Sequence, residues 1–400
     1  MEAYIVDGLR TPIGKLRGSL SPVRADDLAA YTIKALLAKH PGLNPAAIDD
    51  VILGCANQAG EDNRNVARMA ALLAGLPVTV PGETVNRLCA SGMSAVAQAA
   101  RAIKAGDGHL FIAGGVEHMT RGPLVLAKSA QPFGGDTQVY DSSFGWRFVN
   151  PAMHLQYGTD AMGQTAENLA EQLNISRLHQ DQFALRSQQK ATAAAASGRL
   201  AREIVAVAIP QKKGAPQLFE HDEFIKPDTT LEALSALKPA FKQGGTVTAG
   251  NASGLNDGAA ALLIASSRAV DVYQLKPMAK ILNSQVVGVE PRIMGIGPVE
   301  AANQALAKAG LTMAQMDIIE LNEAFAAQVL ACTRSWGLPD DDPRLNPNGG
   351  AIALGHPLGM SGARLLLSAA LQLQQTGGRY ALCTMCIGVG QGYAVVLEKA

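Results

Sequence analysis

Val85-Asn86-Arg87-Leu88-Cys89-Ala90-Ser91-Gly92-Met93-Ser94-Ala95 places a cysteine between an extended approach and an Ala-rich helical run over residues 91–105. Ser91 can cap that helix, and Gly92 allows a tight turn of the backbone. Unpaired N–H groups and the positive end of the helix dipole favour a thiolate at such a position. The segment therefore predicts Cys89 as a nucleophile with a lowered thiol pKa, and the alternative is a small buried cysteine.

Length and composition bound the class of protein. A chain of 400 residues is long enough for two or three domains. Apolar residues make up 48% of the chain and aromatic residues only 4%, with Gly and Ala abundant, which is typical of a close-packed α/β enzyme. Basic and acidic residues balance at 34 each, so charge offers no argument for binding nucleic acid or an anionic membrane.

The N-terminus and the cysteines indicate the compartment. Met1-Glu2-Ala3-Tyr4-Ile5-Val6-Asp7 carries an acid where an export signal needs basic charge, and no apolar run is long enough to span a bilayer. The cysteines are few and odd in number: Cys55, Cys89, Cys332, Cys383 and Cys386. This usage predicts free thiols in a reducing cytoplasm instead of a disulfide framework.

Strands and helices alternate along the first quarter of the chain. The pattern predicts strands at 3–7, 51–54 and 109–115, and helices at 26–39, 63–74 and 91–105. Such alternation predicts a parallel sheet covered on both faces. We expect an N-terminal half over 1–120, an inserted loop domain over 121–245 with helices at 165–173 and 177–197, completion of the first half over 246–275, and a C-terminal half over 276–400.

The last quarter of the chain repeats the first. Val51 and Ile318 begin similar strands 267 residues apart, and Gly92-Met93-Ser94 recurs as Gly359-Met360-Ser361 at the same separation. A shared offset with the same order of elements indicates a duplicated βα half. The residue at this offset from Cys89 is His356. Two halves related by a pseudo-twofold axis would bring this cysteine and this histidine together, although His356 could also be an ordinary loop histidine.

A second dense motif lies near the C-terminus, in Cys383-Thr384-Met385-Cys386-Ile387-Gly388-Val389-Gly390-Gln391-Gly392. A zinc site would need a second pair of ligands, and a dinucleotide site would need a following helix, so we expect no metal and no nucleotide cofactor here. A redox pair should begin a helix, whereas this pair leads into glycines and a strand. A tight turn with exposed N–H groups beside Cys386 is what an oxyanion hole requires.

A polar residue also follows a strand in the second half. Asn322-Glu323-Ala324-Phe325 comes directly after the strand expected at 318–321. The carboxyl end of a strand is where α/β sites recruit side chains, although Asn322 could equally be an ordinary helix cap.

Five motifs, in this order, resemble the thiolase family. They are Asn86-Arg87-Leu88-Cys89-x-Ser91-Gly92, Gly250-Asn251-Ala252-Ser253-Gly254-x-Asn256-Asp257-Gly258, Asn322-Glu323-Ala324-Phe325, Gly355-His356-Pro357-x-Gly359 and Cys386-x-Gly388-x-Gly390-Gln391-Gly392. Within the family, 60–68 and 145–151 resemble the β-ketoadipyl-CoA (3-oxoadipyl-CoA) thiolases. Ala90 departs from the glycine that thiolases often carry beside the nucleophile, and its methyl group could tighten the pocket.

The resemblance implies a fold and a role for each matched residue. It implies an α/β thiolase fold of two duplicated halves in five layers, α-β-α-β-α, with an inserted loop domain. It implies that Cys89 accepts the acyl group, that His356 activates it, and that His356 stabilises the enolate oxygen with a water held by Asn322. Cys386 would act as acid and base at the α-carbon. The N–H groups of Cys89 and Gly388 would form the second oxyanion hole.

The resemblance also implies a substrate and an assembly. Ser253 would contact pantetheine, and Lys226 would lie near the CoA nucleotide. Met162, Phe241 and Ala249 would line the pocket. The implied reaction is cleavage of 3-oxoadipyl-CoA by CoA to succinyl-CoA and acetyl-CoA, in bacterial aromatic degradation. Arg147 is our candidate for the distal carboxylate, although it could be an ordinary surface or interface arginine. CoA would be a co-substrate, no cofactor is expected, and the chain would form a homodimer or homotetramer.

Other functions remain open on the sequence. The nearest is an acetyl-CoA acetyltransferase or a fatty-acid 3-ketoacyl-CoA thiolase with the same chemistry. A ketoacyl-synthase-like condensing enzyme would carry a second histidine where this chain has Cys386. A non-catalytic acyl-CoA-binding protein would not need to retain Cys89, His356, Asn322 and Cys386.

Overall fold

The computed structural model describes residues 1–400. The strands of the main sheet are β1 (Ala3–Arg10), β2 (Gly14–Lys15), β3 (Asp50–Gly54), β4 (Gly82–Val85), β5 (Leu110–His118), β10 (Asn256–Ser266), β11 (Ala279–Gly288), β12 (Ile318–Leu321), β13 (Tyr380–Ile387) and β14 (Gln391–Lys399). Two small hairpins contain β6 (Leu124–Leu126) with β7 (Val139–Asp141), and β8 (Val207–Ile209) with β9 (Gln217–Phe219). The helices are α1 (Ala25–Ala38), α2 (Val66–Leu73), α3 (Ser91–Ala105), α4 (Pro151–Tyr157), α5 (Met162–Gln172), α6 (Arg177–Ala196), α7 (Leu231–Ser235), α8 (Ser267–Tyr273), α9 (Gly297–Ala309), α10 (Ala326–Ser335), α11 (Ala351–Leu354) and α12 (Leu358–Thr376).

The main sheet consists of two half-sheets joined by a short ladder. Its strand order is β12-β13-β14-β11-β1-β10-β5-β3-β4, with β2 attached to β10. The halves meet where β1 pairs with β11 through only two residue pairs, Tyr4 with Lys280 and Ile5 with Ala279. The expectation of a parallel sheet is right for β3, β4 and β5 and for β12 and β13. It is wrong for β1, β10, β11 and β14, which pair antiparallel to their neighbours.

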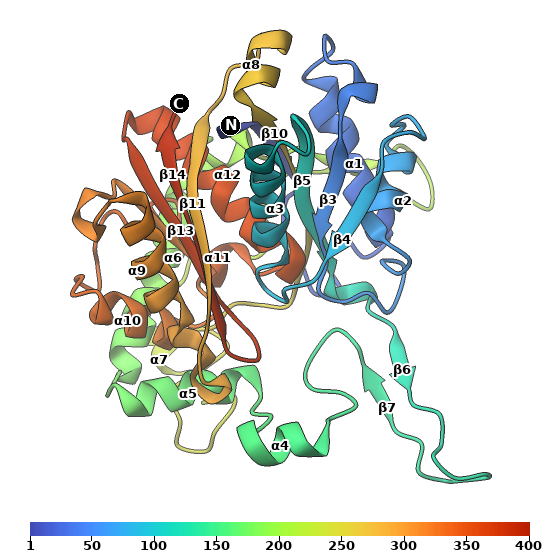
Figure 1. Cartoon of the computed structure of the whole chain (residues 1–400). Coiled ribbons are helices and arrows are strands. Elements are labelled where there is room, and N and C mark those ends of the chain that lie inside the picture. Colours follow the sequence, from blue (N-terminus) through green and yellow to red (C-terminus); the bar gives the residue numbers. More distant parts are fainter.

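The helices form three layers around the two half-sheets, which makes five layers in all (Figure 1). Helices α3 and α12 pack against each other and against both halves of the sheet, and they supply much of the largest buried core. Helices α1 and α2 cover the outer face of the first half, and α9 and α10 lie on the outer side of the second. The predicted five-layered α/β fold is therefore confirmed.

Glycines allow the two central helices to touch backbone to backbone. A Cβ atom at Gly92 of α3 would lie 2.5 Å from the carbonyl oxygen of Gly359 in α12. A Cβ atom at Gly362 would lie 2.5 Å from the main-chain nitrogen of Met93. Because Gly92 and Gly359 are the residues paired by the internal repeat, the predicted meeting of the two helix starts is confirmed.

Between β5 and β10 the chain leaves the sheet. It runs through the β6–β7 hairpin, which projects from the body at the lower right of Figure 1, and through α4 and α5 below the sheets. It continues through α6, which packs against α7, α10 and α11. A buried arginine ties this segment to the first half. Arg10 of β1 bonds Glu203 through Nε at 2.7 Å and Asp222 through Nη1 at 2.6 Å, and all three side chains are buried.

Two predicted helix boundaries need correction. Helix α2 begins at Val66 instead of residue 63, because the Asn65 side chain accepts a hydrogen bond from the Arg68 N–H and caps the helix there. Helix α5 begins at Met162, three residues earlier than expected. That shift places Met162 at a helix start facing the site described next.

Candidate active site

Cys89 lies two residues before α3, in a tight turn. Leu88 adopts a left-handed conformation with φ of 47°. The predicted cap is wrong: the helix is preceded by Ala90, and no side chain caps it. Ser91 Oγ instead accepts from the Arg87 N–H at 2.8 Å and donates to the Leu88 carbonyl at 2.7 Å. Ser91 therefore closes the turn that presents the cysteine.

The predicted lowering of the Cys89 pKa is also wrong. Burial raises the pKa of the Cys89 thiol to about 11, although the N–H of Gly388 faces the sulfur and lowers the pKa, and the Glu117 carboxylate raises it further. Cys89 is partly exposed, whereas the other four cysteines are buried. The resting nucleophile is therefore a thiol that substrate can reach, and it needs a base to ionise it.

His356 lies two residues before α12, as Cys89 does before α3. The ring is buried, and its pKa is lowered to about 3 by burial and then by the Arg364 charge, so the imidazole is neutral. Ser361 Oγ lies 2.7 Å from Nδ1 and donates its own proton to the Pro357 carbonyl at 2.8 Å. This hydrogen-bond pattern assigns the proton to Nδ1 and leaves Nε2 as the acceptor.

Asn322 is the partner of that free nitrogen. Its Nδ2 lies 3.2 Å from His356 Nε2, and its side chain is fully buried. Its Oδ1 is buried without a hydrogen-bond partner in the protein. A free acceptor beside the histidine fits the water that the sequence resemblance places here.

Cys386 is buried in β13, within an apolar cluster that includes Met294, Phe325 and Ala252, with Met162 packed against it. Burial and the nearby Cys89 raise the pKa of the Cys386 thiol well above its usual value. A neutral thiol at this position can donate a proton. Cys383 faces the other side of the strand, where its sulfur contacts the Leu365 carbonyl at 3.6 Å, so the two cysteines are not a redox pair.

Gly388 lies in the β13–β14 turn, directly against the nucleophile loop. A Cβ atom there would lie 3.4 Å from Leu88 Cδ1 and 3.7 Å from Met162 Sδ. The next residue, Val389, is held at φ of 63°, which is rare for a β-branched side chain. Such strain persists only where the surroundings enforce it. The turn thus aims the Gly388 N–H at the Cys89 sulfur.

The other predicted binding residues lie around this centre. Ser253 donates its main-chain N–H to the Ala324 carbonyl at 2.9 Å, which brings its loop beside Asn322. Lys226 Nζ lies 5.1 Å from the centre of the Phe224 ring, and that ring packs over Gly254 next to Ser253.

The predicted pocket-wall residues are placed as follows. Phe241 packs over Gly163 of α5 and lies edge-on to Phe325, with ring centres 6.1 Å apart. Ala249 is exposed on the loop that carries buried Val247 of the Cys386 cluster.

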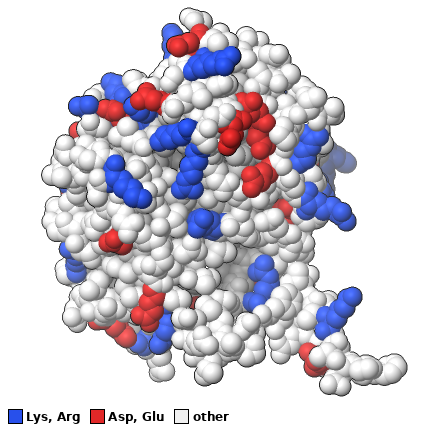
Figure 2. Space-filling view, viewed as in Figure 1, with Lys and Arg blue, Asp and Glu red and all other residues white.

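Arg147 is half-buried at the edge of the first half. Its Nη1 donates to the Ser142 carbonyl at 2.9 Å. Ser142 in turn accepts a hydrogen bond from Asn57 through its hydroxyl at 3.0 Å. Figure 2 shows a hollow between the sheet body and the lower segment, with a basic side chain at its edge.

Sequence reasoning missed a buried acid that joins the halves. Glu117, at the end of β5, accepts from the N–H groups of Ala56 and Asn57 in the first half and from Gly359 in the second, at 2.8 to 3.0 Å. Burial raises its pKa to about 7. An acid directly after the apolar run 110–116 was the available signal.

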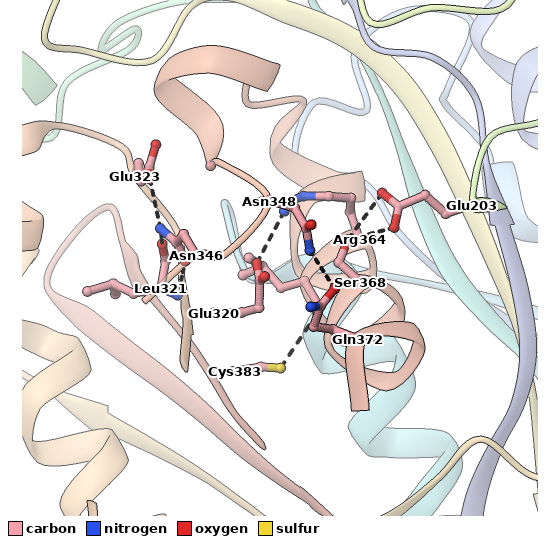
Figure 3. Close-up of polar contacts among 12 residues, drawn as sticks. Glu203, Glu320, Leu321, Glu323, Asn346, Asn348, Arg364, Ser368, Gln372 and Cys383 are labelled. Atoms are coloured by element: carbon pink, nitrogen blue, oxygen red, sulfur yellow. Dashed lines mark hydrogen bonds and ion pairs between the residues drawn. The ribbon is translucent and has the colours of Figure 1, made fainter. Parts of the chain in front are cut away.

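A polar network behind Asn322 was also missed (Figure 3). Glu320 of β12 lies 3.4 Å from Arg364 of α12, and both are buried. Asn346 joins Leu321 to Glu323, and Glu323 also accepts from Ser187 Oγ at 2.6 Å. These contacts brace the strand end that carries Asn322.

Comparison with known proteins decides the family. Residues 3–268 match the family model described as the thiolase N-terminal domain, and residues 275–399 match the thiolase C-terminal domain. The chain belongs to the thiolase family. It is therefore an acyltransferase of the class that acts on acyl-CoA and CoA.

Individual thiolases align over nearly all of the chain. The β-ketoadipyl-CoA thiolase of Acinetobacter baylyi is 62% identical over 99% of both chains. The 3-oxoadipyl-CoA/3-oxo-5,6-dehydrosuberyl-CoA thiolase of Escherichia coli K12 is 61% identical over 100% of this chain and 99% of its own. Human mitochondrial 3-ketoacyl-CoA thiolase superposes with a TM-score of 0.92 at 40% identity, covering 100% of this chain and 99% of the human one.

Two further features of this thiolase bear on its class. No group of three or more His, Cys, Asp or Glu side chains is arranged to hold a metal ion. None of its helices combines the length and the apolar character that crossing a membrane requires.

Proposed function

We propose that this protein cleaves 3-oxoadipyl-CoA with CoA, giving succinyl-CoA and acetyl-CoA in bacterial aromatic degradation. Two observations carry the proposal. The Gly388 N–H and the Cys386 thiol lie beside Cys89, and the Asn322–His356 contact stands at the start of α12, the helix that packs against the helix of the nucleophile. Relatives that are 61–62% identical and named for this substrate support the choice of acyl group.

The first step forms an acyl-enzyme. His356 is neutral with its acceptor nitrogen unprotonated, so it can take the proton of the Cys89 thiol. The thiolate attacks the 3-keto carbon, and the N–H groups of Cys89 and Gly388 stabilise the resulting oxyanion. The bond between the α-carbon and the keto carbon then breaks, leaving the succinyl group on Cys89.

The second step captures the leaving carbanion. Acetyl-CoA departs as an enolate, whose oxygen is stabilised by His356 and by a water on the free Oδ1 of Asn322. The Cys386 thiol, kept neutral by burial, donates its proton to the α-carbon. The Cys386 thiolate then takes the proton of an incoming CoA thiol, and the CoA thiolate takes the acyl group from Cys89. His356 returns its proton to Cys89, so CoA is a co-substrate and no cofactor is required.

The CoA site is proposed from the loops around the centre. Ser253 would contact the pantetheine arm, because its loop lies against the strand end that carries Asn322. Lys226 is exposed beside the same loop and would face the nucleotide. Met162, Phe241 and Ala249 would line the passage between them.

Arg147 is proposed to recognise the distal carboxylate of the substrate. It donates only to a carbonyl group and forms no ion pair, so its charge remains available. A half-buried guanidinium forms strong, directional bonds with a carboxylate. Its anchor, Ser142, contacts Asn57, and Asn57 contacts the Glu117 carboxylate, whose charge raises the pKa of Cys89.

Arg147→Ala tests this assignment. It should lower kcat/KM for 3-oxoadipyl-CoA far more than for acetoacetyl-CoA, because only the first substrate has a distal carboxylate. Arg202→Ala is the matched control, since Arg202 is an exposed arginine of the inserted segment that bonds Gln375. Equal losses with both substrates would make Arg147 structural. A wild-type preference for acetoacetyl-CoA would favour an acetyl-CoA acetyltransferase instead.

The proposed assembly is a homodimer or homotetramer in the cytoplasm. The β6–β7 hairpin projects from the body and exposes Leu124, Leu126 and Val139, which favours burial against another copy. The five free thiols agree with a reducing compartment. Light scattering on the purified protein measures the assembly state directly.

A further inference from the structure

The segment of β12 and Asn322 and the segment of His356 and α12 are joined by two side-chain contacts, which we call the upper and the lower contact. The upper contact is Asn322 Nδ2 with His356 Nε2, at 3.2 Å. The lower contact is Arg364 Nη1 with Glu320 Oε2, at 3.4 Å. Asn322 directly follows β12, and its main-chain N–H continues the pairing with β13 by donating to the Thr384 carbonyl at 3.0 Å. Glu320 stands two residues earlier, so both side chains leave this chain on the same side. Figure 3 shows Glu320 reaching from β12 to Arg364.

We propose that Glu320 and Arg364 are a positioning pair, which sets the spacing between β12 and α12 so that Asn322 meets His356. The proposal rests on the thiolase reaction described above. Ser361 already fixes the His356 ring to α12, at 2.7 Å. What remains to be fixed is the distance from α12 to the strand that carries Asn322, and the lower contact spans that distance.

Stability alone does not account for this pair. Both side chains are almost fully buried, and one atom of each, Glu320 Oε1 and Arg364 Nη2, has no hydrogen-bond partner in the protein. A buried pair with unsatisfied atoms contributes little net stability, and apolar residues of similar volume often serve as well or better. Holding a defined geometry is the role that such a pair performs and an apolar pair does not.

The surrounding charges link the pair to the same histidine. Burial raises the pKa of Glu320 to about 7, and the Arg364 charge lowers it. The same Arg364 charge helps to keep the pKa of His356 low. Farther along α12, Ser368 bonds the Glu203 carboxylate at 3.0 Å, so the helix has a second anchor away from β12.

Two half-reactions separate positioning from general structure. Exchange of acetyl-CoA methyl protons into deuterated water forms the enolate, whose oxygen needs Asn322 and His356 together. Exchange of the acetyl group between acetyl-CoA and labelled CoA uses Cys89, His356 and the N–H groups of Cys89 and Gly388. It does not depend on the position of β12.

The test is Arg364→Met, with the double variant Glu320→Gln/Arg364→Met, which leaves no buried charge unpaired. In both, proton exchange should fall by about 10²-fold, as displacement of a reacting group by about 1 Å typically costs. Acetyl exchange should fall much less. Glu320→Gln alone keeps the side chain's shape and should show the same selective loss to a smaller extent.

Ser368→Ala is the matched control, because it removes a buried polar contact of the same helix that does not reach β12. It should lower thermal stability without changing the ratio of the two exchange rates. The proposal is overturned if the two exchanges fall by the same factor in the folded variants, or if Ser368→Ala changes the ratio as well. Absence of both exchanges in the unaltered protein would instead refute the thiolase function.

Discussion

Replacing Ser361 with alanine should slow thiolysis while leaving substrate binding intact. The Ser361 hydroxyl is the acceptor for the His356 Nδ1 proton, at 2.7 Å. It is locked in that role because its own proton goes to the Pro357 carbonyl at 2.8 Å. Alanine removes the acceptor that keeps the proton on Nδ1 and the lone pair on Nε2.

The magnitude follows from the burial of the ring. His356 is only 4% exposed, so an Nδ1 proton without a partner cannot turn to water. Leaving a buried donor unsatisfied costs about 1–3 kcal/mol. If that cost falls on the reactive tautomer, kcat/KM should drop by about 5- to 150-fold. The loss should appear in kcat and not in KM, because Ser361 lies behind the histidine and not in the CoA site.

Steady-state thiolysis by the purified variant measures this, with thermal melting to confirm folding. Ser94→Ala is the matched control, since Ser94 stands in α3 where Ser361 stands in α12 and follows Cys89 as Ser361 follows His356. The reasoning is refuted if the variant keeps wild-type kcat, or if the control loses as much.

Two further predictions concern other parts of the molecule. Cys386→Ser should reduce acetyl-CoA proton exchange by about 10²–10⁴-fold, because serine is a much weaker acid than a thiol, whereas acetyl exchange through Cys89 should survive; parallel loss of both would contradict a dedicated α-carbon acid. Arg10→Met should lower the free energy of unfolding by about 3–5 kcal/mol, because it leaves the buried Asp222 carboxylate without its charged partner and removes one of the two arginines that pair with Glu203. The control is Arg379→Met, which removes an exposed ion pair and should lower the free energy of unfolding, measured by urea denaturation, by less than about 1 kcal/mol. A similar decrease in both variants would argue against the buried-pair explanation.

For the Cys89 thiol, reasoning from the local sequence predicted a pKa shift in the wrong direction. A helix start stabilises a nearby anion by about 0.3–1 kcal/mol, which is less than one pKa unit. Burial can raise the pKa of a thiol by several units. Groups that shift the pKa of Cys89 come from distant segments: the Gly388 N–H lowers it and the Glu117 charge raises it. The sequence of residues 85–95 alone does not predict that Gly388 and Glu117 lie near Cys89.

The Ser91 cap failed for a different reason. Serine before a helical run commonly caps it, but the hydroxyl here has two closer partners in the preceding turn. That turn requires Leu88 at positive φ, and a leucine in the sequence gives no indication of this conformation. The prediction that Cys89 lies just before a helix was right, because it depended only on where the helical pattern begins.

Spacing along the chain by itself determined the larger features of the fold. The constant offset between the halves predicted that the starts of α3 and α12 would meet, since duplicated units pack as equivalents. The alternation of strands and helices predicted sheets covered by helices on both faces, because each amphipathic element must bury its apolar face, whereas the five layers were implied only by the family resemblance. The motifs and the family resemblance predict Cys89, Asn322, His356 and Cys386 as site residues, and each of them stands at or near the end or start of an element.

Tertiary structure alone decided the electrostatics and the bracing of the site. The directions of the pKa shifts at Cys89, His356 and Glu117 depend on how completely each group is removed from water. The extent of burial of each group is set only when the whole chain has packed. The Glu320–Arg364 contact likewise joins residues 44 positions apart, on a strand and a helix whose spacing exists only after both half-sheets have closed on α3 and α12. Local patterns record which surfaces are apolar, whereas burial and long-range contacts arise when those surfaces meet.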